Sequence, residues 1–397
     1  MINDIVKKGK CYGCRSCEQV CPKNAITMVY DSEGFLVPIV NEKKCIKCKM
    51  CIKSCQAFND KEVLLSKPMA AYAAVGNDKE FISNSASGGI AAVIAKRFLQ
   101  INVDNGMVFG SIFSDDCKTV YHMCIDNVSS ISRIQGSKYV QSDVRDTYHN
   151  VKEALIQGKK VLYFGTPCQI AGLKMTLSKD YKSLFCVDLL CSGVPSPKLW
   201  EKYIDELSNK YAATVTDINF REKSKGWGYN NTKIFFNNQT IMQEPSSRNI
   251  WYKIFSLHII NRKSCNHCKY SSMKRVGDIT LGDFWGIKYA VKGFKSNEGA
   301  SKVLINNEKG MTLIKDVFNE MEYKKIPVSD AIRWSLIFGI HNHKKRDEFL
   351  NEAFNTSLEE TYLKFKLDKK DIFQKIYSSW KGKREKILFV LRKLIYR

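Results

Sequence analysis

The sequence predicts an α+β protein whose central part has an α/β-like core. Its 397 residues suffice for two or three domains of ordinary size. Eight of its 15 cysteines crowd into positions 11–55, and from about residue 69 to residue 300 helical and strand-like patterns alternate with Gly-rich joints. We therefore expect a cysteine-rich domain over residues 1–65, a mixed α/β domain over 66–300 and a helical, basic C-terminal region over 301–397.

The charge balance is strongly basic, with 63 Lys and Arg against 40 Asp and Glu and a formal net charge of +23. Bound anionic prosthetic groups would offset part of this excess, and the remainder suits acidic partners such as a ferredoxin, a flavodoxin or a partner enzyme. No nucleic-acid recognition motif accompanies the charge, so we expect no nucleic-acid partner. No run approaches the ~18 apolar residues of a membrane span, and no signal peptide is evident, which predicts a cytoplasmic protein.

Two cysteine runs of identical spacing lie near the start of the chain. Each reads C-x2-C-x2-C-x3-C; the first is followed by Pro22 and the second by Gln56. Three thiolates at this spacing wrap one corner of a [4Fe-4S] cubane, and the fourth cysteine ligates the other cluster. The expected ligand sets are therefore crossed: Cys11, Cys14, Cys17 and Cys55 for one cluster, and Cys45, Cys48, Cys51 and Cys21 for the second.

The alternative occupant of such thiolates is zinc, which usually binds paired C-x2-C knuckles without a third cysteine at the same spacing. Because the full pattern occurs twice, iron–sulfur clusters are favoured. Residues 5–60 resemble the bacterial two-cluster ferredoxins, which move one electron at a time and carry out no substrate chemistry. The attached 300 or so residues indicate that this module transfers electrons as one part of a larger function.

The mixed α/β segment contains several well-marked elements. Gly88-Gly89 opens a helix that runs to about Leu99, the apolar run Lys160 to Phe164 is a strand that breaks at Gly165-Thr166-Pro167 before another helix, and Leu184 to Leu190 is a second buried strand. Ser196-Pro197 supplies the N-cap and first position of a further helix. Beyond residue 300, helical spacing is shared by Ile314, Val317, Phe318 and Met321.

Three loops at element ends are candidate binding segments. Ser85 to Gly89 precedes a helix whose free N–H groups suit a phosphate, although a simple capped turn explains the same residues. Residues 135–142 form a basic loop, and residues 165–169 join a strand to a helix, where α/β sites tend to lie. Cys168, Cys191, Cys265 and Cys268 are four candidate metal ligands; from the residues alone, core cysteines beside a lone knuckle explain them equally well.

Seven motifs in order resemble the family of coenzyme F420 hydrogenase/dehydrogenase beta subunits over about residues 5–300: SASGG, QGSKYVQS, GTPCQIAGLK, LLCSGVPS, FREKSKGWGY, CNHCKY and VGDITLGDFWG. The resemblance implies a mixed α/β FAD-binding domain that also carries a third [4Fe-4S] cluster beside the flavin. Members of the family pass electrons between clusters and a substrate that accepts or donates hydride. That substrate is a deazaflavin in the founding members and a different compound, such as a chlorophyll precursor, in others.

The resemblance also implies roles for single residues. Cys168, Cys191, Cys265 and Cys268 would ligate the third cluster, while the FAD would contact Ser87, Gly88, Gly89, Lys138, Tyr139, Gln141, Thr166, Gln169 and Asp283. Arg221 and Trp227, like Asp283, lie in motifs whose flavin and substrate roles are not separable. Lys138 is the candidate proton donor, with a phosphate or carboxylate anchor as the alternative role. Cys117, Cys124 and Cys186 match no motif and are expected to be buried core cysteines.

The resulting function is that of an iron–sulfur flavoprotein oxidoreductase that transfers electrons between [4Fe-4S] clusters and FAD to reduce or oxidise a small organic substrate. Two alternatives remain: the beta subunit of a coenzyme F420-dependent hydrogenase or dehydrogenase, and an electron-relay subunit of a larger complex without a substrate of its own. The basic tail from Thr361 has apolar residues around Leu388 and Leu391. It predicts an ordinary packed helix more readily than contact with a membrane surface.

Overall fold

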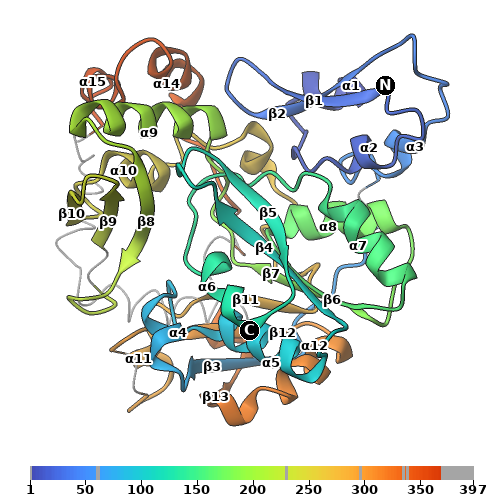
Figure 1. Cartoon of the computed structure of the whole chain (residues 1–397), viewed down its shortest axis with the longest axis vertical. Helices are drawn as coiled ribbons and strands as arrows, with labels where there is room; N and C mark the ends of the chain where they lie inside the picture. The colour runs from blue at the N-terminus through green and yellow to red at the C-terminus, as the bar shows by residue number, and fades with distance from the viewer. Residues whose placement is uncertain are drawn as a thin grey trace.

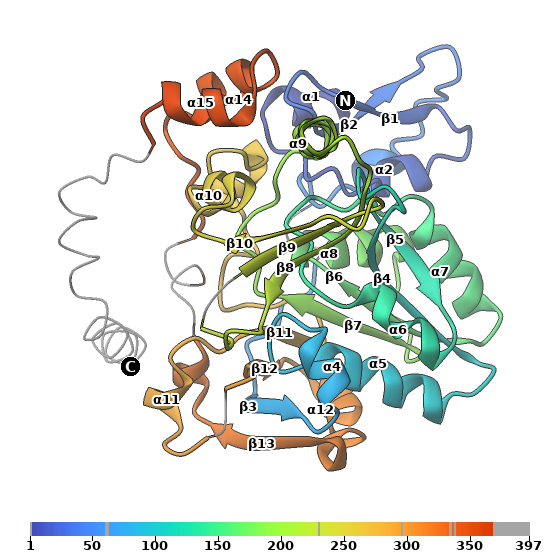
Figure 2. The same cartoon turned by 60° about the vertical axis from the view of Figure 1, so that its left-hand side comes forward.

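A computed structural model describes residues 2–59, 63–228, 231–294, 297–332, 336 and 339–367. An eight-stranded mixed sheet forms its centre, in the strand order β13-β3-β12-β11-β7-β6-β4-β5 (Figures 1 and 2). The strands, in that order, are Met321–Ile326, Ala70–Gly76, Ser301–Ile305, Ile279–Asp283, Leu184–Leu189, Lys160–Gly165, Gly106–Phe113 and Val120–Ile125. The four central strands β11, β7, β6 and β4 are parallel, and the outer ones are antiparallel.

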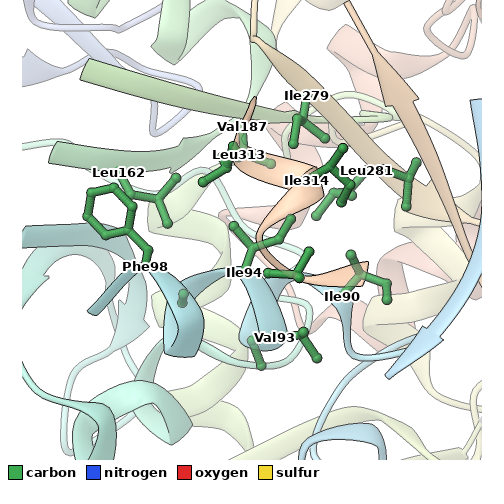
Figure 3. Close-up of a cluster of buried hydrophobic side chains, with 14 of the residues drawn as sticks. Ile90, Val93, Ile94, Phe98, Leu162, Val187, Ile279, Leu281, Leu313 and Ile314 are labelled. Atoms are coloured by element: carbon green, nitrogen blue, oxygen red, sulfur yellow. The ribbon is translucent and has the colours of Figure 1, made fainter. Parts of the chain in front are cut away.

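Helices cover both faces of this sheet. On β6, Leu162 and Phe164 face one apolar cluster while Val161 and Tyr163 face another, as the alternation of side chains along a strand requires. Figure 3 shows the first cluster, in which Ile94 and Phe98 of α5 (Ile90–Ile101) and Ile314 of α12 (Glu308–Lys315) lie against the strands. The opposite face is covered by α7 (Thr147–Ile156) and α8 (Pro167–Leu177). Burial on both faces explains why β6 is an unbroken apolar run.

The predicted elements of this region are confirmed. The helix opened by Gly88-Gly89 is α5, the two buried strands are β6 and β7, and the helix after Pro167 is α8, which connects them. The helix capped at Ser196 is α9 (Pro197–Tyr211), and the Ser196 hydroxyl accepts a 3.3 Å hydrogen bond from the Leu199 amide. A Pro at the first helical position and a hydroxyl at the N-cap are the combination that favours this start.

The cysteine-rich N-terminus forms a small domain against α7 and α8 (Figure 1). It consists of α1 (Ile2–Lys7), α2 (Ser16–Gln19), α3 (Met50–Lys53) and the antiparallel pair β1 (Ile26–Tyr30) and β2 (Leu36–Val40). Short helices α2 and α3 follow the second cysteines of the two runs, so both runs adopt the same local structure. The repeat in the sequence is therefore a repeat in the backbone.

A second sheet and its helices stand beside the main sheet. Strands β8 (Val215–Glu222), β9 (Asn231–Phe236) and β10 (Ile241–Pro245) are antiparallel in the order β10-β9-β8. They pack with α9, α10 (Ile250–Ser256), α14 (Arg346–Ala353) and α15 (Leu358–Lys364) around buried Trp200 and Trp251, whose ring centroids are 4.8 Å apart. The remaining short helices are α4 (Lys79–Ser83), α6 (Ile131–Ile134), α11 (Ile287–Ala290) and 3-10 turns at Val128–Ser130, Lys263–His267, Phe318–Glu320 and Val328–Ala331.

The prediction of a helical region from residue 301 onward is wrong for the two ends of segment 301–326, which are strands on either side of α12. This segment contributes strands β12 and β13, which both pair with β3. Ile314 lies in α12, Val317 and Phe318 lie in the turn after it, and Met321 begins β13, yet all four side chains pack on the same apolar cluster. Their helical spacing therefore reflects a shared core and not a continuous helix.

The tail from residue 368, on which the membrane-surface alternative rests, lies outside the described residues. Within the described residues no helix is long and apolar enough to cross a membrane.

Candidate functional site

The eight N-terminal cysteines gather in the two crossed groups that their spacing predicts. Burial raises the pKa of Cys14 to about 11, and the nearby thiols of Cys55 and Cys11 contribute to this rise. Burial also raises the pKa of Cys17, with added repulsion from the same neighbours. These four cysteines form the first group, in which Cys55 of the second run joins three members of the first run.

The second group has the opposite composition. Burial raises the pKa of Cys51, and Cys45, Cys48 and Cys21 add repulsion, so Cys21 of the first run joins three members of the second. Left-handed residues turn the chain at matching places in the two runs, Gly13 and Arg15 in one and Lys47 and Lys49 in the other. Backbone N–H groups already point at sulfur, with Ala25 N 3.2 Å from the Cys21 Sγ and Gly13 N 3.4 Å from the Cys11 Sγ.

The donor set of each group fits a [4Fe-4S] cluster, which takes four thiolates and hydrogen bonds to its sulfur atoms. Across the described part of the chain, no three His, Cys, Asp or Glu side chains converge tightly enough for a single metal ion. A cubane holds its four thiolates farther apart than one zinc ion does, so the lack of a single-ion site within the described residues is compatible with a cluster. Cluster ligation by these cysteines remains a prediction.

A third group of cysteines gathers from three distant segments. Cys168 lies in the first turn of α8, Cys191 lies just beyond β7, and Cys265 and Cys268 lie in and after the 3-10 turn Lys263–His267. Burial raises the pKa of Cys265 to about 12, with further repulsion from Cys191 and Cys268. Burial raises the pKa of Cys168 as well, and all three partners add to it. The four predicted ligands of a third cluster are therefore brought together.

The first and third groups are joined by a short buried bridge. The Gln56 side-chain amide donates a 2.7 Å hydrogen bond to the Cys168 carbonyl, and Lys269 Nζ donates a 2.6 Å bond to the Gln56 carbonyl. Tyr12 and Tyr270 have ring centroids 5.9 Å apart, and Cys168 and Cys268 of the third group add to the effect of burial in raising the pKa of both tyrosines. Tyr270 is close enough to Cys14 and Cys168 that both thiols, after burial, contribute to raising its pKa.

A cavity of about 590 Å³ opens at the carboxyl ends of the parallel strands β6, β7 and β11. Thr166 follows β6, Cys191 follows β7 and Asp283 ends β11, and all three line the cavity. This is the place where open α/β sheets bind ligands, and the volume is ordinary for a small-molecule or cofactor site. Because Cys191 belongs to the third group, that group reaches the cavity wall.

The structure places seven of the nine predicted FAD-contacting residues on the cavity wall: Ser87, Gly89, Lys138, Tyr139, Thr166, Gln169 and Asp283. Gly88 lies behind it, where its amide donates a 3.1 Å bond to the Ser301 hydroxyl and a Cβ would meet the Ala74 carbonyl at 2.6 Å. Gln141 also lies behind the wall, since its Nε2 donates to the Tyr12 carbonyl and its Oε1 accepts from Arg262. FAD contact by these residues stays a prediction.

Lys138, the candidate proton donor, is held by its own loop. Its Nζ donates a 2.6 Å hydrogen bond to the Gln135 carbonyl and a 3.4 Å bond to the Arg133 carbonyl. Burial lowers the pKa of Lys138 to about 7, since the fold disfavours the charged form. Both the donor role and the anchor role are compatible with this geometry.

Arg221 and a tryptophan pair form another part of the wall. Arg221 Nη1 donates a 2.8 Å bond to Asp283 Oδ2 and a 3.3 Å bond to the Tyr139 hydroxyl, while its buried Nη2 has no partner within the described residues. The guanidinium carbon lies 4.9 Å from the centroid of Trp285, which stacks on Trp227 at 4.3 Å. A buried cationic donor next to a flat aromatic surface suits a planar, polar-edged ligand.

His122 is a site residue that sequence reasoning missed. It lines the cavity from β5, is 3% exposed, stacks on Tyr163 and makes a 3.0 Å bond from Nε2 to the Phe164 carbonyl. Since a carbonyl only accepts, Nε2 carries the hydrogen, and burial lowers the pKa of His122 to about 4. A single histidine in an apolar strand carries no sequence signal. Of the three other cysteines, Cys117 and Cys186 are buried as predicted, and Cys124 is half-buried.

Comparison with known proteins agrees with this arrangement. Residues 10–59 match the 4Fe-4S dicluster domain, and residues 158–330 match the C-terminal part of the beta subunit in coenzyme F420 hydrogenase/dehydrogenase. The predicted resemblance is confirmed, and the chain combines an iron–sulfur electron-transfer domain with a domain of that type. The second match ends at residue 330, shortly after β13, which is the last strand of the main sheet in the sequence.

Two curated proteins are similar to this chain. The coenzyme F420-dependent sulfite reductase of Methanocaldococcus jannaschii is 25% identical over 49% of this chain, which spans only 29% of that protein. The F subunit of the F420H2 dehydrogenase of Methanosarcina mazei is 21% identical over 82% of this chain and 87% of its own length. Among solved structures, a chain of the F420-reducing [NiFe] hydrogenase complex from Methanosarcina barkeri is 18% identical, with a TM-score of 0.46 over 77% of this chain and 94% of that one.

Proposed function

We propose that this chain is an iron–sulfur electron-transfer subunit of the F420 hydrogenase/dehydrogenase type, which connects a redox partner to FAD and to a deazaflavin in the cavity. The names of the two curated relatives, and the length over which the dehydrogenase relative matches, support this beta-subunit alternative better than a self-contained reductase of some other small compound.

The observation that carries the proposal is that the three cysteine groups follow one another from the protein surface to the cavity. Cys48 of the second group is exposed, the thiol of Cys51 adds to the raised pKa of buried Cys17 in the first group, and Gln56 joins the first group to Cys168 in the third. Cys191 of the third group then lines the cavity. Three clusters held in this order would supply a path for single electrons between the surface and a ligand in the cavity.

In the cavity, FAD would supply the exchange between single electrons and hydride. The chain's residues would bind and orient it. The N-terminus of α5 at Gly89 offers free N–H groups to a phosphate, and the loop carrying Lys138 lines the same cavity. Arg221, fixed by Asp283, presents its unpartnered Nη2 to a ring oxygen or nitrogen. Trp285 offers a flat face to a ring and helps to exclude water from the cavity.

Anaerobic purification followed by iron, sulfide and flavin analysis tests this proposal. We expect about 12 iron atoms, four for each of three [4Fe-4S] clusters, and one FAD per chain. Cys191→Ser should lower the iron content by about four atoms and block reduction of the flavin by way of the clusters. Cys186→Ser is the matched control, because Cys186 is buried in β7 and belongs to none of the three cysteine groups.

A turnover assay distinguishes the proposed function from the alternative functions. The loaded protein should reduce or oxidise a deazaflavin with an artificial electron carrier as the other reactant. About eight iron atoms without flavin would leave a ferredoxin fused to a scaffold domain and would overturn the proposal. Three clusters and FAD that turn over another small compound, but no deazaflavin, would favour the self-contained reductase instead.

A further inference from the structure

The second cysteine group is the exposed end of the cluster path. Cys48 is exposed, and the apolar side chains beside it are exposed as well, Ile46 by 57% and Met50 by 44%. In contrast, the first group contains buried Cys17, and Gly172 of α8 comes so close that a Cβ there would meet Cys14 at 3.0 Å. Electrons that enter or leave the protein through its surface therefore have the second group as their nearest terminus.

Five lysines surround this terminus. Lys43, Lys44, Lys47, Lys49 and Lys53 are all exposed, and the one carboxylate between residues 42 and 53 belongs to Glu42. No ion pair neutralises any of these five ammonium groups within the described residues. We name this surface, consisting of the five lysines with Ile46 and Met50, the distal lysine surface. Unpaired like charges around one spot create a positive potential that attracts an acidic partner.

We infer that the distal lysine surface docks a small acidic one-electron carrier protein and exchanges single electrons with it. The inference rests on the proposed function, because it needs a cluster held by the second group. In each exchange one electron leaves the reduced carrier and enters that cluster, so the carrier is oxidised and the cluster reduced, and no bond or proton is transferred. The reverse exchange uses the same surface.

The composition of the surface favours a protein over other acidic partners. Exposed Ile46 and Met50 lie among the lysines, which resembles the apolar centre and charged rim of a transient protein interface. A nucleic acid or a lipid surface would use the charge but has no redox centre to bring near Cys48. Electron transfer weakens steeply with distance, so exposure of a cluster is useful to a partner that carries its own redox centre.

Anaerobic stopped-flow mixing with a reduced acidic two-cluster ferredoxin as the probe tests this inference. In Lys43→Glu/Lys47→Glu/Lys53→Glu, the second-order rate of cluster reduction at low ionic strength should fall about tenfold or more. The gap between variant and parent should shrink as added salt shortens the Debye length to about 3 Å at 1 M. Reduction by dithionite, a small reductant, should keep its rate in both proteins.

The matched control is Lys324→Glu/Lys325→Glu, which reverses two exposed lysines on the edge strand β13, at the end of the molecule opposite the N-terminal domain (Figure 2). It should leave the ferredoxin rate within about twofold of the parent rate, since the reversed charges lie at the opposite end of the molecule from the second group (Figure 2). If charge reversal at residues 43, 47 and 53 lowers the iron content, the Lys→Gln triple variant, compared at equal iron content, takes its place.

Three results would overturn the inference. The first is an unchanged ferredoxin rate in the triple variant, and the second is an equal loss of rate in the control. The third is a difference in sedimentation between the triple variant and the parent without ferredoxin, which would mark the surface as a contact between two copies of this chain. Failure of the proposed function has a different signature. In that case dithionite would reduce the clusters without any electron reaching a flavin in the cavity, whatever the ferredoxin rate.

Discussion

The side-chain amide of Gln56 donates a 2.7 Å hydrogen bond to the backbone carbonyl of Cys168. Gln56 occupies the position that Pro22 occupies after the first cysteine run, and its side chain is 1% exposed. Gln56 directly follows Cys55 of the first cysteine group, and its side chain contacts Cys168 of the third cysteine group. The departure from the repeated pattern is therefore the point at which the cluster domain is joined to the central domain.

Replacing this side chain should weaken both stability and electron flow. Gln56→Ala removes the side-chain donor to the Cys168 carbonyl, which should lower the free energy of unfolding by about 0.5–1.5 kcal/mol. Reduction of a flavin in the cavity by dithionite-reduced clusters should also slow, because the first and third groups lose a direct connection. Urea unfolding and stopped-flow absorbance of the loaded protein measure the two effects.

Gln157→Ala is the control for this change, because Gln157 is exposed at the end of α7. It should alter neither quantity measurably. If Gln56→Ala lowers stability but leaves the rate of flavin reduction unchanged, Gln56 only holds the domains together.

Lys138 gives a pH test that separates its two candidate roles. Burial lowers the pKa of Lys138 to about 7, so its ammonium form declines as the pH rises through 7. If Lys138 anchors a phosphate or carboxylate, FAD affinity should fall by roughly tenfold between pH 6 and pH 8.5, about 1.4 kcal/mol for one lost charge contact. Isothermal titration of flavin-depleted protein measures this affinity.

The variants of Lys138 decide the outcome. Lys138→Met should bind FAD weakly at both pH values and lose the pH dependence, while Lys138→Arg should bind tightly at both, since a guanidinium keeps its charge. If Lys138 is instead a proton donor, the Lys138→Met variant should bind FAD with unchanged affinity and lose turnover. A flat affinity profile in the parent protein would contradict the anchor role.

His122 should make folding stability depend on acid. Burial lowers its pKa from 6.5 to about 4, so the unfolded chain binds more protons than the folded one between these values. Stability contributed by neutral His122 is therefore full above pH 6.5 and declines as the pH falls toward 4, by up to about 1.4 kcal/mol per pH unit.

His122→Gln retains a donor toward the Phe164 carbonyl without a titrating ring, and it should flatten this decline over pH 6.5–5 in urea unfolding. His149→Gln, on the exposed side of α7, is the control and should leave the slope as it is in the parent. Equal slopes in the parent and in His122→Gln would show that other groups cause the acid sensitivity.

The parts of this structure that local pattern determines were predictable. The crossed cysteine groups follow from a spacing that allows one turn of chain around each cluster, and α5, β6, α8, β7 and α9 follow from apolar runs bounded by Gly, Pro and Ser. Residues brought together only by the tertiary fold were not accessible in this way. Gln56 and Cys168 are 112 positions apart, and His122 stands alone in its strand.

The third cysteine group is an intermediate case. Spacing could not join Cys168 and Cys191 to the knuckle at Cys265 and Cys268, and only the family resemblance suggested the set that the fold gathers. The prediction for the segment after residue 300 was wrong for the opposite reason, because a local pattern was present but misleading. Ile314 and Met321 have the spacing of one helix face, although the chain turns between them.

Gly172 provides a sharp test of how closely the cluster domain fits on α8. In a helix interior, Gly→Ala usually stabilises by about 1 kcal/mol. Here the added methyl carbon would meet Cys14 Cβ at 3.0 Å, Cys14 Sγ at 3.1 Å and the Tyr148 hydroxyl oxygen at 3.0 Å. Overpacking of this kind costs about 1–3 kcal/mol, so the crowding should cancel or exceed the helical gain.

We therefore expect Gly172→Ala to be no more stable than the parent in urea unfolding, and to be less stable by up to about 2 kcal/mol. The electron paramagnetic resonance signal of the reduced first cluster should change, because Cys14 has to shift, while the dithionite-reduced second cluster keeps its signal. Gly228→Ala is the control, since no atom of the described residues lies within 4 Å of a Cβ built there and its φ is not left-handed. A variant that gains the full helical stabilisation with an unchanged signal would show that Cys14 does not press on α8 as closely as these distances require.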